Sequence, residues 1–308
     1  MLNSKVRIYY YAKSFIPRRL QIFLRRRLVK RQLAQSVGVW PIDESAKEPP
    51  PGWTGWPGQK QIALVLTHDV DTQKGLDNCL RLADVEERIG FRSVFNFVAC
   101  KYVVPVQIRE ELTARGFEVG LHGLYHDSSL YHSKQEFLGQ APKINQILND
   151  WNAVGFRSPC MYHNLDWMHD LDIEYDASTF DTDPFEPQPD GVHTIFPFYV
   201  SNALATGGYV ELPYTLPQDF TIFILMKYRT IDIWTEKLEW IVQKGGMALL
   251  NTHPDYMNFD DKKLKIEEYP VAYYEEFLNY LKVKYDGKYW NPLPREIAKF
   301  WLDREARS

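Results

Sequence analysis

The chain has 308 residues, 45% of them hydrophobic, and a net charge of −4. A chain of this length buries roughly three quarters of the surface that it exposes when unfolded, enough for one large α/β domain or two small ones. Its three cysteines are not closely spaced, which argues against a disulfide framework. The sequence has no run of about 20 apolar residues that would cross a membrane. We recognise no secretory leader, and we therefore expect a cytoplasmic protein.

Basic residues are concentrated at the start of the chain. Residues 1–40 contain ten Lys and Arg and no Asp or Glu, which leaves a net charge of −14 on the remainder. Residues 14–37 place apolar side chains at helical spacing between arginines, which predicts a basic amphipathic helix. Such a helix either lies on an anionic membrane surface or packs its apolar side on the domain. We expect no nucleic-acid partner, because the acidic remainder would repel a polyanion.

The predicted organisation has three parts. Residues 1–40 form the basic amphipathic segment, and residues 41–60, rich in Pro, Gly and Trp, predict a linker or an extended lip. Residues 61–308 form the main domain, where strands and helices alternate and favour a parallel α/β barrel. Strands are expected at 62–66, 93–99, 117–121, 154–157, 173–176, 209–212, 220–225 and 247–251. Helices are expected at 75–89, 106–115, 133–151, 164–171, 231–244, 268–285 and 293–306.

The first predicted strand ends in a cluster of polar residues. Apolar or small residues at 62–66 are followed by Thr67-His68-Asp69-Val70-Asp71. A buried strand that carries charged groups at its C-terminal end is typical of α/β active sites. Alternation places Asp69 and Asp71 on the same side of the strand, where one carboxylate can bind a metal and the other act as a base. The alternative is an Asp-rich turn without a catalytic role.

A pair of histidines follows another predicted strand. His122 and His126 are four residues apart, so on one helical turn both imidazoles can reach a single cation. Either Asp69 or Asp71, at the end of a neighbouring strand, can supply a third ligand. Two histidines and one carboxylate leave metal positions open for water and a substrate oxygen. The spacing alone is common and would also suit ordinary loop histidines.

Two further strand ends carry candidate functional residues. Arg157, in Gly155-Phe-Arg157-Ser-Pro159, can hold a carboxylate through its planar guanidinium. His253 follows the last predicted strand and can act as a general acid near neutral pH. Either residue alone would suit a structural role. Because Asp, His, Arg and His residues all fall at strand ends, the sequence indicates one site.

In this order the motifs resemble those of the polysaccharide deacetylases of the NodB-homology type, also classed as carbohydrate esterase family four. The resemblance covers roughly residues 60–255 and implies a deformed (β/α) barrel whose enzymes remove N-acetyl groups from sugars with the help of a metal. It implies that Asp69 is the general base and that Asp71, His122 and His126 bind a divalent metal. Zinc is the metal expected, with cobalt or manganese as alternatives.

The same resemblance implies roles for residues outside the metal ligands. Arg157 would tether and tune the base, and His253 would protonate the leaving amine. The backbone N–H of Cys160 would help to hold the oxyanion. Asp176 and Asp181 resemble the acidic stretch that orients the acid histidine, and the sequence does not decide between them.

Three positions depart from the usual pattern of that family. The usual Asp-Asp pair is replaced by Asp-Val-Asp, a form found in one branch, which shifts the metal ligand by one position. Gly123 stands where a Ser or Thr is usual, so a hydrogen bond to the site is expected to be missing. His68 replaces an aromatic residue and could compete for the metal.

The expected activity is hydrolysis of an amide bond in an amino sugar or polysaccharide precursor, carried on a lipid or a nucleotide. Peripheral membrane contact through residues 14–37 is expected to accompany it. A deformylase or another amide hydrolase on the same fold is the alternative. A non-catalytic carbohydrate-binding protein is a further alternative, although such a protein would not need an acid like His253.

Overall fold

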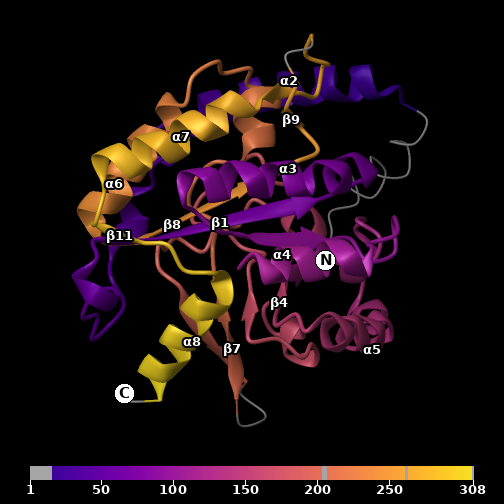
Figure 1. Cartoon of the computed structure of the whole chain (residues 1–308), viewed down its shortest axis with the longest axis vertical. Coiled ribbons are helices and arrows are strands. Elements are labelled where there is room, and N and C mark those ends of the chain that lie inside the picture. The colour runs from indigo at the N-terminus through magenta and orange to yellow at the C-terminus, as the bar shows by residue number, and fades with distance from the viewer. Residues whose placement is uncertain (1–15, 203–206, 261–262, 307–308) are drawn as a thin grey trace.

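The computed structural model describes residues 16–202, 207–260 and 263–306 (Figure 1). The main sheet contains β1 (Ile62–Val70), β2 (Val94–Phe97), β3 (Glu118–Leu121), β4 (Gly155–Phe156), β5 (Tyr175–Asp176), β6 (Phe198–Ser201), β7 (Gly208–Glu211), β8 (Met247–Thr252) and β11 (Tyr289–Trp290). A small second sheet pairs β9 (Met257–Asn258) with β10 (Tyr269–Pro270). The longer helices are α2 (Arg18–Gln35), α3 (Gln73–Ile89), α4 (Val106–Ala114), α5 (Lys134–Trp151), α6 (Asp232–Lys244), α7 (Val271–Lys284) and α8 (Pro294–Glu305). Short helical turns are η1 (Glu44–Lys47), η2 (Pro57–Gln59), η3 (Ser129–Tyr131), η4 (Pro159–Met161), η5 (Trp167–Asp170) and η6 (Phe220–Leu225).

The main sheet is curled and almost entirely parallel. Its order is β11-β1-β2-β3-β4-β5-β7-β6, and β8 also pairs with β1. Among these pairings, β6 with β7 is antiparallel. Parallel bridges join Phe180 to Tyr214 and Leu216 to Leu250, so the chain after β7 returns to β8 and the first strands. This architecture confirms the predicted deformed (β/α) barrel.

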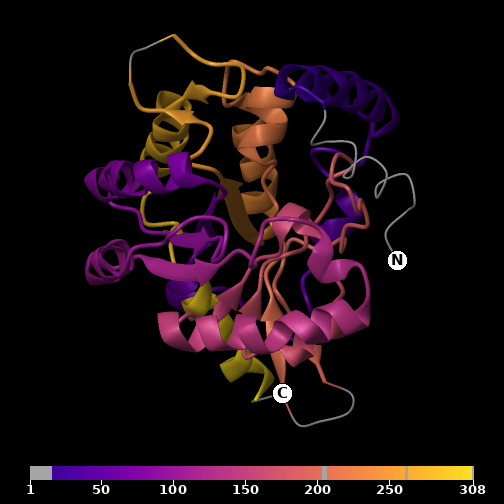
Figure 2. The same ribbon diagram turned by 90° about the vertical axis from the view of Figure 1, so that its right-hand side faces the viewer.

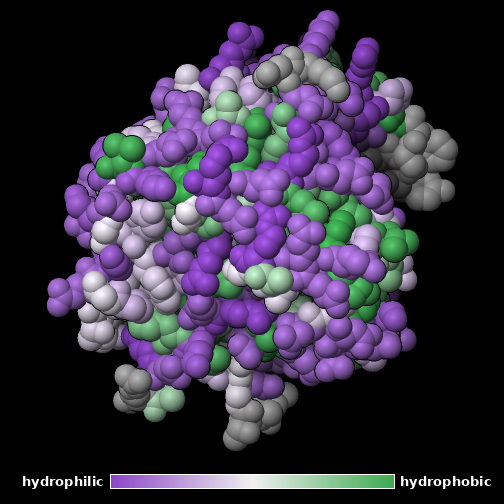
Figure 3. Space-filling view, viewed as in Figure 1, coloured by the Kyte–Doolittle hydropathy of each residue, from purple (hydrophilic) through white to green (hydrophobic). Residues whose placement is uncertain are grey.

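Strand β1 organises the core and the site. All nine of its residues are buried, because β1 pairs with β8 and β2 while helices cover the sheet (Figure 1). Parallel strands bring their carboxyl ends to one edge of the sheet. Asp69 and Asp71 therefore lie near the residues that follow β3, β4 and β8. The outer face seen in Figure 3 is largely hydrophilic, as expected for helices that cover a buried sheet.

Most predicted helices are present, because their sequences combine a stripe of apolar side chains, which becomes buried, with capping residues at the helix ends. Thr72 caps α3 by accepting a hydrogen bond from the backbone N–H of Lys74, and Gly90 ends the helix at a φ of 99°. The helix predicted at 164–171 is reduced to the single turn of η5.

The strand predicted at 220–225 is wrong. These residues form the π-helical turn η6, which begins where the Asp219 side chain accepts a hydrogen bond from the N–H of Phe220. All six residues of η6 are buried. A short apolar run buried on every side has no alternation that would separate a strand from a helix.

Helix α2 packs on the domain but leaves part of its apolar surface exposed. Ile22 and Val29 are buried, and the Arg26 side chain donates a hydrogen bond to the carbonyl of Ile224 in η6. Leu20 and Leu28 remain 46% and 55% exposed. Residues 14 and 15 of the predicted helix lie outside the described part of the chain. Figure 2 views the molecule from the side toward which β1 points, and α2 crosses the upper part of that face.

Residues 41–60, predicted to be a linker or an extended lip, are attached to the main domain. Trp56 is buried in the main core, and its indole N–H donates a hydrogen bond to the carbonyl of Gly245. Trp53 packs against Trp301 of α8, with ring centroids 5.4 Å apart. Aromatic side chains therefore fix this Pro-rich stretch to the barrel. Within the described residues, no helix combines the length and apolar character needed to span a membrane.

Candidate active site

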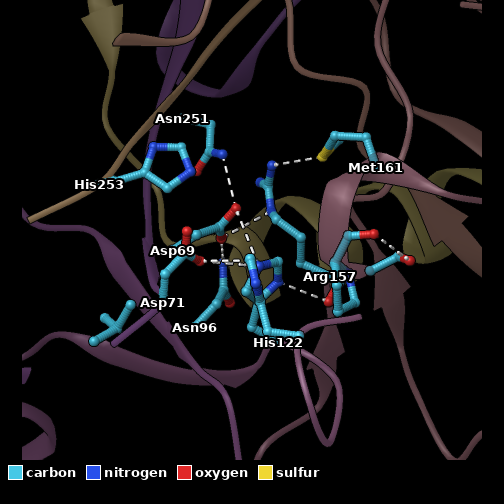
Figure 4. Close-up of polar contacts among 12 residues, drawn as sticks. Asp69, Asp71, Asn96, His122, Arg157, Met161, Asn251 and His253 are labelled. Atoms are coloured by element: carbon cyan, nitrogen blue, oxygen red, sulfur yellow. Dashed lines mark hydrogen bonds and ion pairs between the residues drawn. The ribbon is translucent and has the colours of Figure 1, made fainter. Parts of the chain in front are cut away.

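The base predicted at the end of β1 is buried and held by three side chains. One carboxylate oxygen of Asp69 accepts a hydrogen bond from Asn96 at 3.1 Å, and the other accepts one from Asn251 at 2.8 Å (Figure 4). Arg157 Nε lies 3.4 Å from Asp69 Oδ1, an ion pair rather than a close hydrogen bond. Burial opposes the charge of Asp69, but His122 in its protonated form and Arg157 outweigh it and hold the pKa of Asp69 below its ordinary value.

Three side chains that can bind a metal meet beside this carboxylate. The ligand atoms of Asp71, His122 and His126 all lie within 4.8 Å of one another. Asp71 Oδ1 is 3.5 Å from His122 Nε2 and 2.9 Å from His126 Nε2. Asp71 comes from the end of β1 and the histidines follow β3, so adjacent parts of the sheet edge supply the group.

The chemistry of these atoms fits a divalent cation. His122 Nδ1 lies 3.0 Å from the carbonyl oxygen of Arg157, which can only accept, so Nδ1 carries the proton. In the neutral ring, Nε2 then carries a lone pair directed toward Asp71 Oδ1, a buried atom without a hydrogen-bond donor. Burial lowers the pKa of His126 and favours its neutral, metal-binding form. A cation between these atoms would satisfy all three.

Arg157 is buried beneath the base, as the tethering role requires. Its side chain is completely buried, and Nη2 donates a hydrogen bond to Thr67 Oγ1 at 3.0 Å. Among the described residues, the carboxylate of Asp69 is its ion-pair partner within 4 Å. The guanidinium therefore stabilises the ionised form of Asp69 and fixes its orientation.

The histidine predicted to be the acid is oriented by a residue that the sequence did not indicate. His253 Nδ1 lies 2.7 Å from Asp219 Oδ1, and the backbone N–H of His253 donates to Asp219 Oδ2 at 2.8 Å. The Tyr269 hydroxyl also donates to Oδ2. Burial opposes the charge of His253, but the Asp219 carboxylate outweighs it and raises the pKa of His253 to about 10. His253 is therefore protonated at neutral pH.

The predicted contact of Asp176 or Asp181 with His253 is wrong. Asp181 forms a buried ion pair with Lys237, with 2.7 Å between Oδ2 and Nζ. Asp176 accepts a hydrogen bond from Ser178, and burial raises its pKa to about 6. Neither carboxylate lines the cavity that contains the metal-binding group. Their strand and turn direct them into separate polar clusters of the barrel.

One cavity connects the catalytic candidates. It has a volume of about 630 Å³, and Asp69, Asp71, His122, His126 and His253 line it. Such a volume is in the range of small-molecule sites.

The turn after β4 also reaches this cavity. Cys160 lines it and adopts a φ of 57°, next to Pro159 at the start of η4. Gly123 faces the same turn, with a φ of 66°, and a Cβ there would lie 2.8 Å from the Pro159 ring. A side chain at position 123 would therefore be strained, which explains why this chain has Gly where Ser or Thr is usual.

His68 does not reach the metal-binding group, so the expected competition does not occur. It alternates with Asp69 along β1 and points to the other side of the strand. Its ring contacts Thr252 Oγ1 at 2.8 Å and Glu86 Oε1 at 2.9 Å, and all three residues are buried. His68 therefore links β1 to β8 and α3 through buried polar contacts.

The sequence analysis also missed Asn96 and Asn251. Each lies within a buried strand, β2 or β8, and directly follows an apolar residue. A polar side chain in such a strand must find a hydrogen-bond partner, which is a signal that could have identified both. Gly120 on β3 leaves the space that Asn96 needs, since a Cβ there would lie 2.2 Å from Asn96 Oδ1.

Solved structures share this architecture. A protein described as a polysaccharide deacetylase from Mycobacterium smegmatis aligns with a TM-score of 0.59 and 18% identity, over 83% of this chain and 96% of its own. Another from Pseudomonas aeruginosa PAO1 gives 0.60 and 17%, over 86% and 98%. The allantoinase PuuE gives 0.62 and 16%, over 86% and 98%. A search of protein-family models finds no match to the chain, and a search of curated proteins finds none either.

These alignments establish the fold. The chain has the fold of the polysaccharide deacetylases, as its ordered motifs predict, and at these identities the alignments establish nothing finer. An allantoinase shares the same architecture. The chemistry of this chain must therefore be argued from its own site.

Proposed function

We propose that the protein is a metal-dependent amide hydrolase that removes an N-acetyl group from an amino sugar or a polysaccharide precursor. The observation that carries the proposal is the meeting, in one cavity, of a metal-binding group, the carboxylate of Asp69 and the protonated ring of His253. A carbohydrate-binding protein needs neither a buried base nor an imidazolium held by a buried carboxylate. The fold shared with polysaccharide deacetylases supports the proposed substrate class.

The side chains divide the reaction between a base and an acid. A bound divalent ion would supply Lewis-acid polarisation of the amide carbonyl and activation of water. Asp69, kept ionised by Arg157, takes a proton from the attacking water. The backbone N–H of Cys160 supports the negative charge that develops on the carbonyl oxygen. His253 donates its proton to the departing nitrogen, so the amide and water become an amine and a carboxylate.

The proposed metal is zinc. Asp71, His122 and His126 offer two imidazole nitrogens and one carboxylate oxygen, a donor set typical of catalytic zinc sites that keep a position open. Cobalt and manganese are the alternatives, because they accept the same ligand types.

The substrate is proposed to be carried on a lipid or a nucleotide, with α2 touching the cytoplasmic face of a membrane. The support is the exposed apolar surface of α2, where Leu20, Phe23 and Leu28 are 46–55% exposed among arginines. Anionic lipids attract such basic helices. The full chain is expected to sediment with anionic vesicles and the Leu20→Gln/Leu28→Gln variant much less. Equal sedimentation of both proteins would contradict the membrane contact.

A panel of N-acetyl and N-formyl amino sugars tests the activity. The zinc-loaded protein is expected to release a free amine and acetate, and removal of the metal with a chelator is expected to abolish release. Faster release of formate would favour the deformylase alternative. Saturable sugar binding without any amine would contradict hydrolysis. Amides outside the sugars belong in the panel, because an allantoinase shares the fold.

A further inference from the structure

A second cavity adjoins the metal-binding group. It has a volume of about 810 Å³ and lies partly beneath residues 263–268, which follow the small strand β9. Asp71, His126, Arg18 and Tyr256 line both this cavity and the one that contains Asp69 and His253. The two cavities therefore meet at the metal-binding group.

Basic side chains outnumber acidic ones in the lining of the second cavity. Six cationic side chains line it: Arg18, Arg19, Lys74, Lys101, Lys263 and Lys265. Four carboxylates line it as well and offset part of this charge: Asp71, Asp255, Glu267 and Glu268. Glu267 pairs with Arg18, and Glu268 lies 2.8 Å from Lys74 and 3.7 Å from Lys265.

Three of the six cations lack an acidic partner. Arg19, Lys101 and Lys263 have no carboxylate within ion-pair distance among the described residues. Lys101 instead lies 3.5 Å from His126 Nδ1. A divalent ion held by Asp71 and the histidines would add positive charge at the same wall.

The first cavity has a different lining. Its outer part is formed by Leu24 and Leu28 of α2 together with Phe185 and Phe220. If the amide of a substrate lies at Asp71 and His126, the apolar wall of the first cavity lies on one side of it and the cationic second cavity on the other. Such an arrangement suits a molecule that carries a negative charge a short distance from its amide.

We propose that the basic cavity is a subsite for a phosphate group attached to the amino sugar. This inference rests on the proposed function and specifies its substrate class. Phosphate suits this cavity because Arg and Lys are the side chains that bind it most often, and it can accept hydrogen bonds from several donors at once. The donors come from three separate parts of the chain, namely α2, the start of α3 and residues 263–265.

Calorimetry with two matched sugars tests the subsite. N-acetylglucosamine 1-phosphate and neutral N-acetylglucosamine would each be titrated into the zinc-loaded Asp69→Asn protein, which binds without turnover. The phosphate form is expected to bind at least about tenfold more tightly, because charge-assisted hydrogen bonds are the stronger class. The advantage is expected to shrink as salt is added.

Charge-neutralising variants locate the effect. In an Arg19→Gln/Lys263→Gln background the tenfold advantage is expected to fall to about twofold, with binding of the neutral sugar unchanged. The double variant Lys143→Gln/Lys299→Gln removes two exposed cations elsewhere and is expected to keep the full advantage. If the phosphorylated sugar still binds about tenfold more tightly than the neutral sugar in Arg19→Gln/Lys263→Gln, the phosphate binds to the metal instead, which would overturn the subsite.

Competition separates the two sources of phosphate. Displacement of the sugar phosphate by vesicles containing phosphatidic acid would identify a lipid headgroup, and displacement by uridine diphosphate would identify a nucleotide. Either result supports the subsite, whereas failure of both competitors would overturn it. If the protein binds metal and neutral sugar but does not distinguish the phosphate, the subsite fails while the hydrolase proposal stands.

Discussion

Replacing Asp69 with Asn is expected to lower kcat by about 10²–10⁴-fold, the usual contribution of a general base. The substitution leaves Asp71, His122 and His126 in place, so the metal content is expected to remain unchanged. Asn has nearly the same shape as Asp but cannot accept the proton of the attacking water. Loss of activity with retained metal would identify Asp69 as the base rather than as a ligand.

The same substitution is expected to reduce stability. Arg157 is fully buried, and Asn would leave its charge without the carboxylate that now faces it at 3.4 Å. Removing one partner of a buried ion pair costs about 3–5 kcal/mol of unfolding free energy. Urea denaturation would measure this loss. Asp77→Asn, at an exposed position of α3, is the matched control and should change neither kcat nor stability appreciably. Full activity in Asp69→Asn would contradict the assigned role.

Replacing Asp219 with Asn is expected to shift the alkaline limb of the pH–rate profile to lower pH. In the wild type, the pKa of His253 is raised to about 10, although burial opposes this shift. His253 therefore stays protonated through neutral pH and loses its proton only as the pH rises toward 10. The acid limb depends on Asp69, whose pKa lies below its ordinary value. Activity should therefore be high across neutral pH and fall at both extremes.

Without the Asp219 charge, burial is opposed by the weaker effects of Asp71 and Asp69 alone, so the pKa of His253 falls. The alkaline limb is expected to move down by about 2 units or more, and kcat at pH 9 to drop by about tenfold or more. Tyr269→Phe removes the hydroxyl that donates to Asp219 but keeps the carboxylate, so it should shift the limb far less. An unchanged alkaline limb in Asp219→Asn would show that His253 is not the acid.

The residues proposed as metal ligands, base, arginine and acid could be predicted from the sequence because most of them occupy strand ends. Parallel strands bring their carboxyl ends to one edge, so Asp69, Asp71, Arg157 and His253 had to lie close together once the strands were recognised. His122 and His126 followed from their spacing. Asp69, Asp71, His253 and the two histidines line one cavity, and Arg157 contacts Asp69, in agreement with that reasoning.

Asp219 escaped detection for a physical reason. It lies 34 residues before His253 and precedes an apolar run that the sequence could not separate from a strand. Its role depends on the η6 turn, on Tyr269 and on the folded position of β8, all set by tertiary packing. Asp181 was an attractive choice by sequence, but Lys237 of α6 pairs with it in the fold. A buried carboxylate takes the nearest cation, which only the three-dimensional structure reveals.

The most direct test is the metal content of the purified 308-residue protein beside that of His122→Ala. About one divalent ion per chain is expected in the wild type and in His132→Ala, whose ring lies outside the metal-binding group, and almost none in His122→Ala. Amine release should follow the metal content across the three proteins. A wild-type protein that takes up no ion after incubation with zinc, cobalt or manganese would contradict the metal-dependent hydrolase.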